Sequence, residues 1–250
     1  MKITFLYHSA FLVELTGCSL LFDWYGGPVP DFDRNKPLYV FISHHHGDHY
    51  APEIFSLLGM DNVWYFSATC VRLSAKRKQA LGIEESHLFR LSAGQTAAAG
   101  DVTVTTLRST DAGVAFLVTC EGKTLFHAGD LQWWHWEEEP ESWNADMERD
   151  FKRECAKLQG RAVDVAFLVL DPRQEEAFWW GFDWWMRTMD VAAAFPMHSW
   201  EDFSLVRRLK ALPVSEPYRD RVQEIRYPGQ QFLLGESGEI SSCENPFGVV

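Results

Sequence analysis

The sequence predicts an α/β protein with two mixed β-sheets and helices on the outer faces of both. Short apolar or alternating runs, which are typical of strands, fall into two groups, one near the start of the chain and one after residue 100. Helical segments follow each group and must bury an apolar stripe against a sheet. At 250 residues and 46% hydrophobic content, the chain can bury a large core, and we expect one domain over residues 1–250.

Turn and helix signals mark the elements of the first group. Thr16-Gly17 separates two strands, and Pro52–Leu58 reads as a helix because proline stands in its first turn. Val71–Leu81 reads as a helix that ends at Gly82. The predicted strands are Ile3–Tyr7, Phe11–Leu15, Ser19–Asp23, Tyr39–Ile42 and Val63–Phe66.

The second group follows the same logic. Glu121-Gly122 predicts a hairpin turn, Ser142–Leu158 a charged helix with Ser142 as its N-cap, and Phe203–Leu212 a helix stopped by Pro213. The predicted strands are Val102–Leu107, Val114–Thr119, Thr124–Phe126, Val163–Leu170, an apolar run over Val191–Met197, Ile225–Tyr227 and Gln231–Leu234.

The run from Ser43 to His49, Ser-His-His-His-Gly-Asp-His, is the most informative motif in the chain. It follows a buried apolar strand and contains the pattern His-x-His-x-Asp-His. Imidazole and carboxylate groups suit divalent zinc, manganese or iron. A tight loop after a strand can direct alternate side chains to one metal ion and the next ones to a neighbouring ion.

This motif resembles that of the metallo-β-lactamase superfamily, and the order of later motifs agrees with it. The resemblance implies a four-layer αββα sandwich of two mixed sheets flanked by helices, with one or two divalent metal ions, zinc first and manganese or iron as alternatives. It implies that His44 and His46 bind the first metal, and Asp48 and His49 the second. Asp130, in Gly129-Asp130 after a short apolar strand, would bridge the two ions, and His198 after Pro196-Met197 would complete the second site.

One ligand that the resemblance leads us to expect is missing. A third histidine for the first metal belongs in the stretch from Val102 to Gly113, which has none. Asp111 is the nearest polar candidate and could replace it as a carboxylate ligand. Alternatively Asp111 only caps the turn, or one of His87, His127 and His135 supplies the ligand. The first site could therefore be absent, weaker than the second, or selective for a metal other than zinc.

Two more histidines match a lactonase-like and phosphodiesterase-like subset of the superfamily. His8, in a His-Ser pair at the end of the first strand, would lie near the metals and could donate a proton to the leaving group. His127, in His-Ala-Gly-Asp, would orient Asp130 or a bound ligand. The alternative for both is a core histidine with satisfied hydrogen bonds.

The tryptophans have two interpretations. Trp133, Trp134 and Trp200 follow ligand-bearing strands, so they line a cleft or pack in the core. For Trp179–Trp185 we favour core packing or a subunit interface, which leaves a homo-oligomer open. Asp171 and Arg173 end a buried strand and are either substrate contacts or a turn.

Charge and composition exclude several classes. A net charge of −12 argues against nucleic-acid binding, which needs basic patches. The N-terminus lacks a signal-peptide pattern, no apolar run reaches the length of a membrane helix, and five scattered cysteines suit reduced thiols. We therefore expect a cytoplasmic protein that acts on a small molecule, away from the membrane.

The resulting expectation is a metal-dependent hydrolase in which a metal-activated hydroxide attacks an ester, lactone, amide or phosphodiester. Asp48 would bind metal and orient the nucleophile, and His8 would act as the proton donor. A catalytically degenerate metal- or ligand-binding protein of the same fold is the alternative, and an iron-based redox enzyme is a third hypothesis.

Overall fold

The computed structural model describes the whole chain except residues 28–30, 58–61, 236–238 and 244–250. Its residue contacts separate into two compact units. Unit 1 comprises Met1–Leu91 together with Arg226–Val250, and unit 2 comprises Ser92–Ile225. The single domain expected over residues 1–250 stays a prediction.

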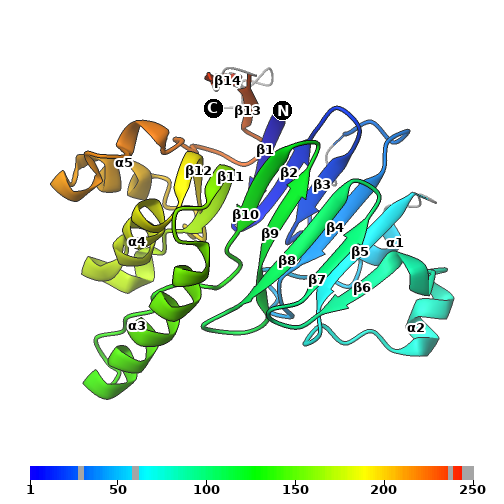
Figure 1. Ribbon diagram of the computed structural model, residues 1–250, viewed down its shortest axis with the longest axis horizontal. Helices are drawn as coiled ribbons and strands as arrows, with labels where there is room; N and C mark the ends of the chain where they lie inside the picture. Colours follow the sequence, from blue (N-terminus) through cyan, green and yellow to red (C-terminus); the bar gives the residue numbers. More distant parts are fainter. Residues whose placement is uncertain (28–30, 58–61, 236–238, 244–250) are drawn as a thin grey trace. The chain divides into compact units, whose positions relative to one another are not determined.

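Unit 1 is built on an eight-stranded mixed sheet (Figure 1). The strands from β14 to β3 pair antiparallel, and those from β3 to β6 pair parallel. In spatial order they are β14 (Ile240–Cys243), β13 (Gln231–Leu234), β1 (Lys2–Tyr7), β2 (Ala10–Glu14), β3 (Ser19–Phe22), β4 (Leu38–Ile42), β5 (Val63–Ala68) and β6 (Leu88–Leu91).

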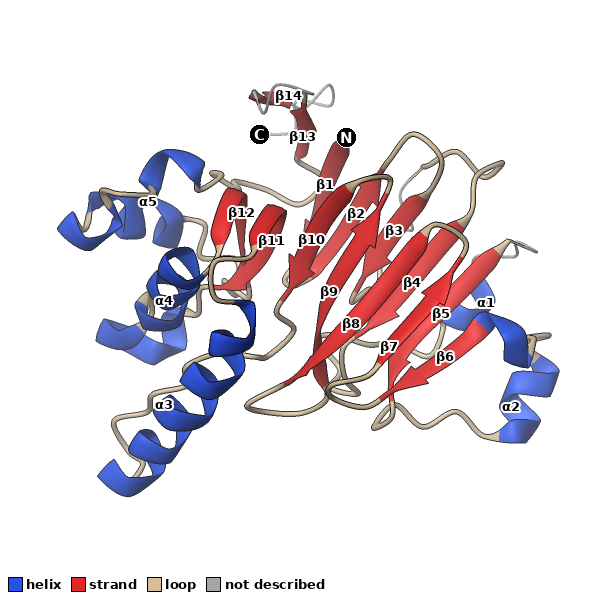
Figure 2. Cartoon of the chain, viewed as in Figure 1, coloured by secondary structure: helices blue, strands red, loops and turns tan. Residues whose placement is uncertain are grey.

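Aromatic side chains tie the parallel strands of unit 1 together. Phe22, Phe41, Phe66 and Phe89 stack in sequence across β3 to β6, with ring centroids 4.5, 5.3 and 4.9 Å apart. Such offset stacks add to the free energy gained by burying the rings. The short helices are α1 (Ile54–Leu57), α2 (Ala75–Ala80) and the 3-10 turn Glu85–His87, and Figure 2 shows α1 and α2 beside β5 and β6.

Unit 2 contains a six-stranded mixed sheet and the longer helices. The strands from β7 to β10 pair antiparallel, and β10, β11 and β12 pair parallel. In spatial order they are β12 (Asp190–Met197), β11 (Ala162–Val169), β10 (Lys123–His127), β9 (Val114–Cys120), β8 (Val102–Arg108) and β7 (Thr96–Ala99). The helices α3 (Glu141–Cys155), α4 (Trp180–Thr188) and α5 (Ser204–Ala211) gather beside β11 and β12 (Figure 2).

The core of unit 2 is centred on Trp185 of α4, which is fully buried. Its indole lies 4.8 Å from the ring of Phe126 on β10 and 5.6 Å from that of Phe151 on α3. One tryptophan therefore fastens two helices to the sheet, and the core-packing interpretation is correct for this residue.

The predicted fold class of two mixed sheets with helices is confirmed, and most predicted elements agree within two residues. Helix α2 is shorter than predicted because Ser74 caps it, accepting a hydrogen bond from the Arg77 amide. Ser142 is not an N-cap, since Pro140 takes that place. Ile225–Tyr227 is not a strand, and Leu58, predicted to end the first helix, lies outside the described residues. Within the described residues, strands β6, β7 and β14 and helix α4 were not predicted.

No helix among the described residues has the length and hydropathy needed to span a membrane. In the same part of the chain, Cys18, Cys70, Cys120 and Cys155 form no disulfide.

Removal of the Trp185 side chain tests the core of unit 2. We expect Trp185→Ala to lower the free energy of unfolding by about 3–5 kcal/mol, because it leaves a large cavity between two helices and the sheet. Chemical denaturation measures this, with the exposed Leu233→Ala as control, expected to cost about 0.5 kcal/mol. A loss below about 1 kcal/mol for Trp185→Ala would contradict a central role.

Candidate functional site

The candidate site residues of unit 1 lie near the carboxyl ends of its parallel strands. Strands β3 and β4 pair in register, with Phe22 opposite Phe41. Asp23 directly follows β3 and Ser43 directly follows β4, so the pairing brings them side by side at the carboxyl edge of the sheet. Open α/β sheets place ligands at this edge.

The buried Asp23 carboxylate organises the start of the histidine motif. It accepts hydrogen bonds from the Ser43 amide at 2.8 Å and the Ser43 hydroxyl at 2.6 Å, and it lies 2.8 Å from Nδ1 of His49. A carboxylate only accepts, so Nδ1 of His49 carries the proton. Since the Ser43 hydroxyl donates to Asp23, it accepts from Nδ1 of His44, 2.9 Å away. In the neutral rings of His44 and His49, Nε2 is therefore the lone-pair atom, the tautomer that a metal needs.

The loop after β4 brings three ligand types together. The amides of His49 and Tyr50 both donate to the carbonyl of His46, which closes a tight turn. Ligand atoms of His44, His46 and Asp48 all lie within 4.8 Å of one another. Imidazoles and carboxylates are the donor groups with which proteins bind divalent ions. The turn thus gathers, within unit 1, three of the residues that the sequence singled out.

His8 lies beside Asp48 in the same unit. Its Nε2 is 3.5 Å from the Asp48 carboxylate, and its ring meets that of His49 edge-on, with centroids 5.6 Å apart. The His8 imidazole holds the pKa of Asp48 well below its ordinary value, although partial burial opposes this. Asp48 is therefore a carboxylate at neutral pH, as a metal ligand must be.

Unit 2 repeats the arrangement at the end of its own parallel strands. Asp130 follows β10, Asp171 follows β11 and His198 follows β12. The in-register pairing of β11 with β12 sets Asp171 next to His198, whose Nδ1 is 2.8 Å from that carboxylate. Nε2 of His198 points instead to Asp130, at 3.5 Å. Asp171 thus fixes the tautomer of His198 as Asp23 fixes that of His49.

Asp171 is fully buried and bears a charge. Burial raises the pKa of Asp171, but hydrogen bonds from His198 and Arg173 outweigh this and leave the pKa below its ordinary value. Arg173 donates from Nε at 3.0 Å, from Nη2 at 2.6 Å and from its own amide at 2.8 Å. The Asp171 carboxylate is therefore hydrogen-bonded to protein groups and ion-paired with Arg173.

Asp111 lies on the surface of unit 2, close to Asp130. Carboxylate oxygens of the two residues lie within 4.8 Å of each other. The neighbouring Thr110 ties their loops together, because its hydroxyl donates to the carbonyl of Gln132 at 2.6 Å and accepts from the Gln132 amide at 3.0 Å. The pair agrees with a carboxylate at the position of the missing histidine, and that role of Asp111 stays a prediction.

The three alternative histidines lie in other surroundings. His127 is buried, and its Nδ1 accepts from the Gly129 amide at 3.1 Å, which steadies the turn that carries Asp130. The ring of His135 lies 4.8 Å from that of Trp180. Among the described residues, no group of three potential ligand atoms includes His87, His127 or His135.

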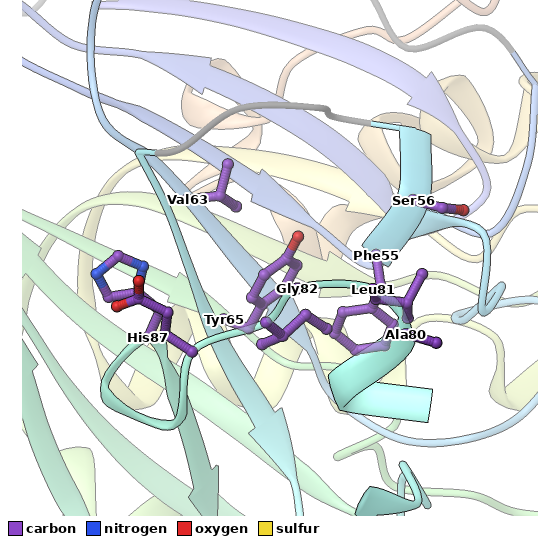
Figure 3. Close-up of a pocket in the computed structure, with 10 residues that line it drawn as sticks. Phe55, Ser56, Val63, Tyr65, Ala80, Leu81, Gly82 and His87 are labelled. Atoms are coloured by element: carbon purple, nitrogen blue, oxygen red, sulfur yellow. The ribbon is translucent and has the colours of Figure 1, made fainter. Parts of the chain in front are cut away.

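His87 belongs to a separate cavity of unit 1, of about 650 Å³ (Figure 3). Val63 and Tyr65 of β5 line it together with Phe55 and Leu81 (Figure 3). Val63 begins β5 and His87 precedes β6, whereas the histidine motif follows the last residue of β4. Because these strands are parallel, the cavity lies toward the opposite edge of the sheet from the motif.

Several site residues have a positive φ angle, a backbone conformation that is uncommon for residues other than glycine. His8, Asp23 and His198 have φ angles of 48°, 43° and 67°. Such conformations persist only where the surroundings enforce them, and they cluster at functional sites. The hydrogen bonds to Asp23 and Asp171 help to provide that enforcement.

The chain can be assigned to a family from its similarity to known proteins. The family described as "Beta-lactamase superfamily domain" matches residues 2–141, more than half of the chain. The chain belongs to the β-lactamase superfamily. The resemblance inferred from the histidine motif is thereby confirmed.

Individual relatives and solved structures are also similar to the chain. The chain is 31% identical over 144 residues to a UPF0173 metal-dependent hydrolase of Pyrobaculum neutrophilum, covering 52% of this chain and 61% of the relative. A shorter match, 47% over 57 residues, covers 22% of this chain and 25% of a UPF0173 metal-dependent hydrolase of Desulforamulus reducens. The chain thus spans from a quarter to three fifths of the length of these relatives.

Among solved structures, a metallo hydrolase from Ignicoccus hospitalis has a TM-score of 0.60 at 17% identity, covering 98% of both chains. A metal-dependent hydrolase from Parabacteroides distasonis has a TM-score of 0.57 at 16% identity, covering 89% of this chain and 92% of its own. At such identities the similarity shows the fold alone.

Asp23 was not predicted as a site residue. It stands at the end of a predicted strand, and an aspartate after an apolar strand, just ahead of the strand that carries the motif, is a signal that could identify it. The role of Asp171 beside His198 was also not predicted, because 27 residues separate the two and only the pairing of β11 with β12 joins them.

Asp171 should make stability depend on pH in the acid range. Its folded pKa lies below the unfolded value of about 3.9, so its stabilising effect is present above about pH 4 and lost as the pH falls through the folded pKa. We expect Asp171→Asn to be less stable at pH 7 by of the order of 3 kcal/mol and to lose less stability on acidification. Urea unfolding of metal-free protein at a series of pH values measures both effects.

The exposed Asp101→Asn serves as the control and should leave the pH profile unchanged. Parallel pH profiles for Asp171→Asn and the unaltered protein would contradict a buried, charged Asp171.

Proposed function

We propose that the protein is a metal-dependent hydrolase that acts on a small-molecule ester, lactone or phosphodiester. One observation carries the proposal: His44, His46 and Asp48 converge in one turn, and the neighbouring Asp23 sets the metal-binding tautomers of His44 and His49. The relatives that the chain matches are named metal-dependent hydrolases, which supports the same activity.

The donor set fits one or two divalent ions. We assign His44 and His46 to a first ion, Asp48, His49 and His198 to a second, and Asp130 to both, with Asp111 as a further ligand of the first. Neutral imidazoles and ionised carboxylates suit zinc, and manganese or iron can also be bound by them. Asp111 is exposed and would give the first ion a carboxylate in place of an imidazole, so the two ions would be held with unequal affinity.

When bound, a divalent ion lowers the pKa of water and polarises a substrate oxygen, which allows hydrolysis near neutral pH. The residues of the chain supply the rest. Asp48 orients the attacking water through its carboxylate, which His8 keeps ionised. His8 donates a proton from Nε2 to the leaving group. Asp23 and Asp171 hold the ligand rings of His49 and His198 in one orientation.

Metal content tests the assignment of ligands. Protein purified without a histidine tag should contain about two divalent ions per chain by elemental analysis. Asp111→Ala should lose the first ion and His198→Ala the second, because each removes one ligand from a small set. The tag-free protein with His45→Ala is the matched control, since His45 is exposed and stands at a spacer position of the motif.

A single ion that survives Asp111→Ala but is lost in His198→Ala would make the first site vestigial and favour a mononuclear enzyme or the non-catalytic binding protein. Full metal content in His198→Ala would contradict the assignment of that ligand.

His8 is tested by kinetics. We expect His8→Gln to lower kcat by about 100-fold or more on a substrate with a poor leaving group, with KM nearly unchanged, because general acid catalysis is lost. With an activated 4-nitrophenyl leaving group the same variant should lose far less. Equal losses for both leaving groups, or a loss of bound metal, would show that His8 does not act as the proton donor.

A further inference from the structure

Trp200 lies two residues after His198 and is unusually exposed for an indole. In the described part of the chain, Trp200 and Leu233 are the large apolar side chains that remain exposed, and 46% of the Trp200 surface is accessible. A single exposed hydrophobic residue is common. The contacts that orient the Trp200 ring, however, distinguish it from an ordinary exposed residue.

Three groups of the site orient the Trp200 ring. It meets the His198 ring edge-on, with centroids 5.8 Å apart at 87°. Its Nε1 lies 3.4 Å from the Asp171 carboxylate, and the Arg173 guanidinium carbon lies 4.6 Å from the ring centroid. A cation over the face of an indole is an attractive contact. The ring is therefore positioned by the same residues that position the candidate metal ligand.

The backbone from His198 to Glu201 also includes conformations that are unfavourable for residues other than glycine. Trp200 and Glu201 have φ angles of 50° and 64°, and His198 has 67°. Left-handed conformations of this kind concentrate at ligand clamps and active sites. An arrangement that keeps an indole exposed at the expense of backbone strain indicates a ligand contact.

The neighbouring tryptophans do not offer such a surface. Trp134 also faces His198, with ring centroids 5.7 Å apart, but it is 5% exposed and stacks on Trp136. Trp133 lies among Phe151, Trp180 and Trp184 of the helices. Of the three residues predicted to line a cleft, Trp200 is the one whose exposure and position suit that role.

We propose that Trp200 is a stacking platform for a planar ring of the substrate, so that the enzyme prefers aryl or heterocyclic substrates to aliphatic ones of the same size. The inference rests on the proposed function, because the ring would be attached to the group hydrolysed beside His198. Flat rings gain from stacking on an indole beyond the area that they bury, whereas a saturated ring gains only the burial.

Binding of a matched pair of ligands tests this. Phenylphosphonate and cyclohexylphosphonate have the same ring size and anionic group, and neither is hydrolysed. Isothermal titration calorimetry on metal-loaded protein should show a phenyl preference of about three- to tenfold. Trp200→Leu should reduce the ratio of the two dissociation constants to about one, and Trp200→Phe should restore most of it.

Trp179→Leu is the matched control. Trp179 is half-buried and its ring lies 6.5 Å from that of Trp180, so its loss should leave the phenyl preference unchanged. Circular dichroism and metal content, measured on each variant, confirm that the fold and the candidate metal site are retained.

The same titrations on metal-free protein separate this inference from the proposed function. Absence of bound metal or turnover would overturn the proposed function, yet a phenyl preference abolished by Trp200→Leu would still support the platform. Three results would overturn the stacking platform. They are equal binding of the two phosphonates, a phenyl preference that survives Trp200→Leu, and no binding of either phosphonate to metal-loaded or metal-free protein.

Discussion

The hydrogen bond from a histidine Nδ1 to a buried carboxylate is the interaction on which the rest of the site depends. It joins His49 to Asp23 in unit 1 and His198 to Asp171 in unit 2, at 2.8 Å in both. Burying a carboxylate is costly unless several donors compensate for the lost water. Asp23 has the Ser43 hydroxyl and amide as further donors, and Asp171 has the Arg173 guanidinium and amide.

Parallel strand pairing makes these interactions available. In each unit, adjacent parallel strands end in register, so residues that are far apart in sequence emerge side by side at one edge of a sheet. The stacked phenylalanines of unit 1 and the Trp185 contacts of unit 2 keep the strands that carry the site in place. The left-handed backbone of His8, Asp23 and His198 is the cost of turning the chain sharply at that edge.

The carboxylates of this acidic chain fix which nitrogen of each neighbouring histidine carries a hydrogen. The net charge is −12, yet the carboxylates nearest the histidines are paired with specific donors. A hydrogen on Nδ1 of His49 and His198 places the lone pair of the neutral ring on Nε2. Arg173 sets a positive charge between Asp171 and the indole of Trp200. The same few residues thus link a candidate metal ligand with the surface that we propose to bind the substrate ring.

The superfamily, the two mixed sheets and the histidine loop follow from the amino-acid sequence, because local signals indicate them. The motif from Ser43 to His49 lies within one turn, and alternating or buried apolar runs identify most strands without tertiary information. Strands β6, β7 and β14 were not predicted because each has four residues, too few for an alternating pattern to stand out. Helix α4 was not predicted because tryptophan, which occupies three of its nine positions, is enriched in strands. The roles of Asp23 and Asp171, the choice between core and interface for Trp185 and the exposure of Trp200 came from the three-dimensional structure. The roles of Asp23 and Asp171 depend on parallel pairing, which joins strands separated by long connections in the sequence.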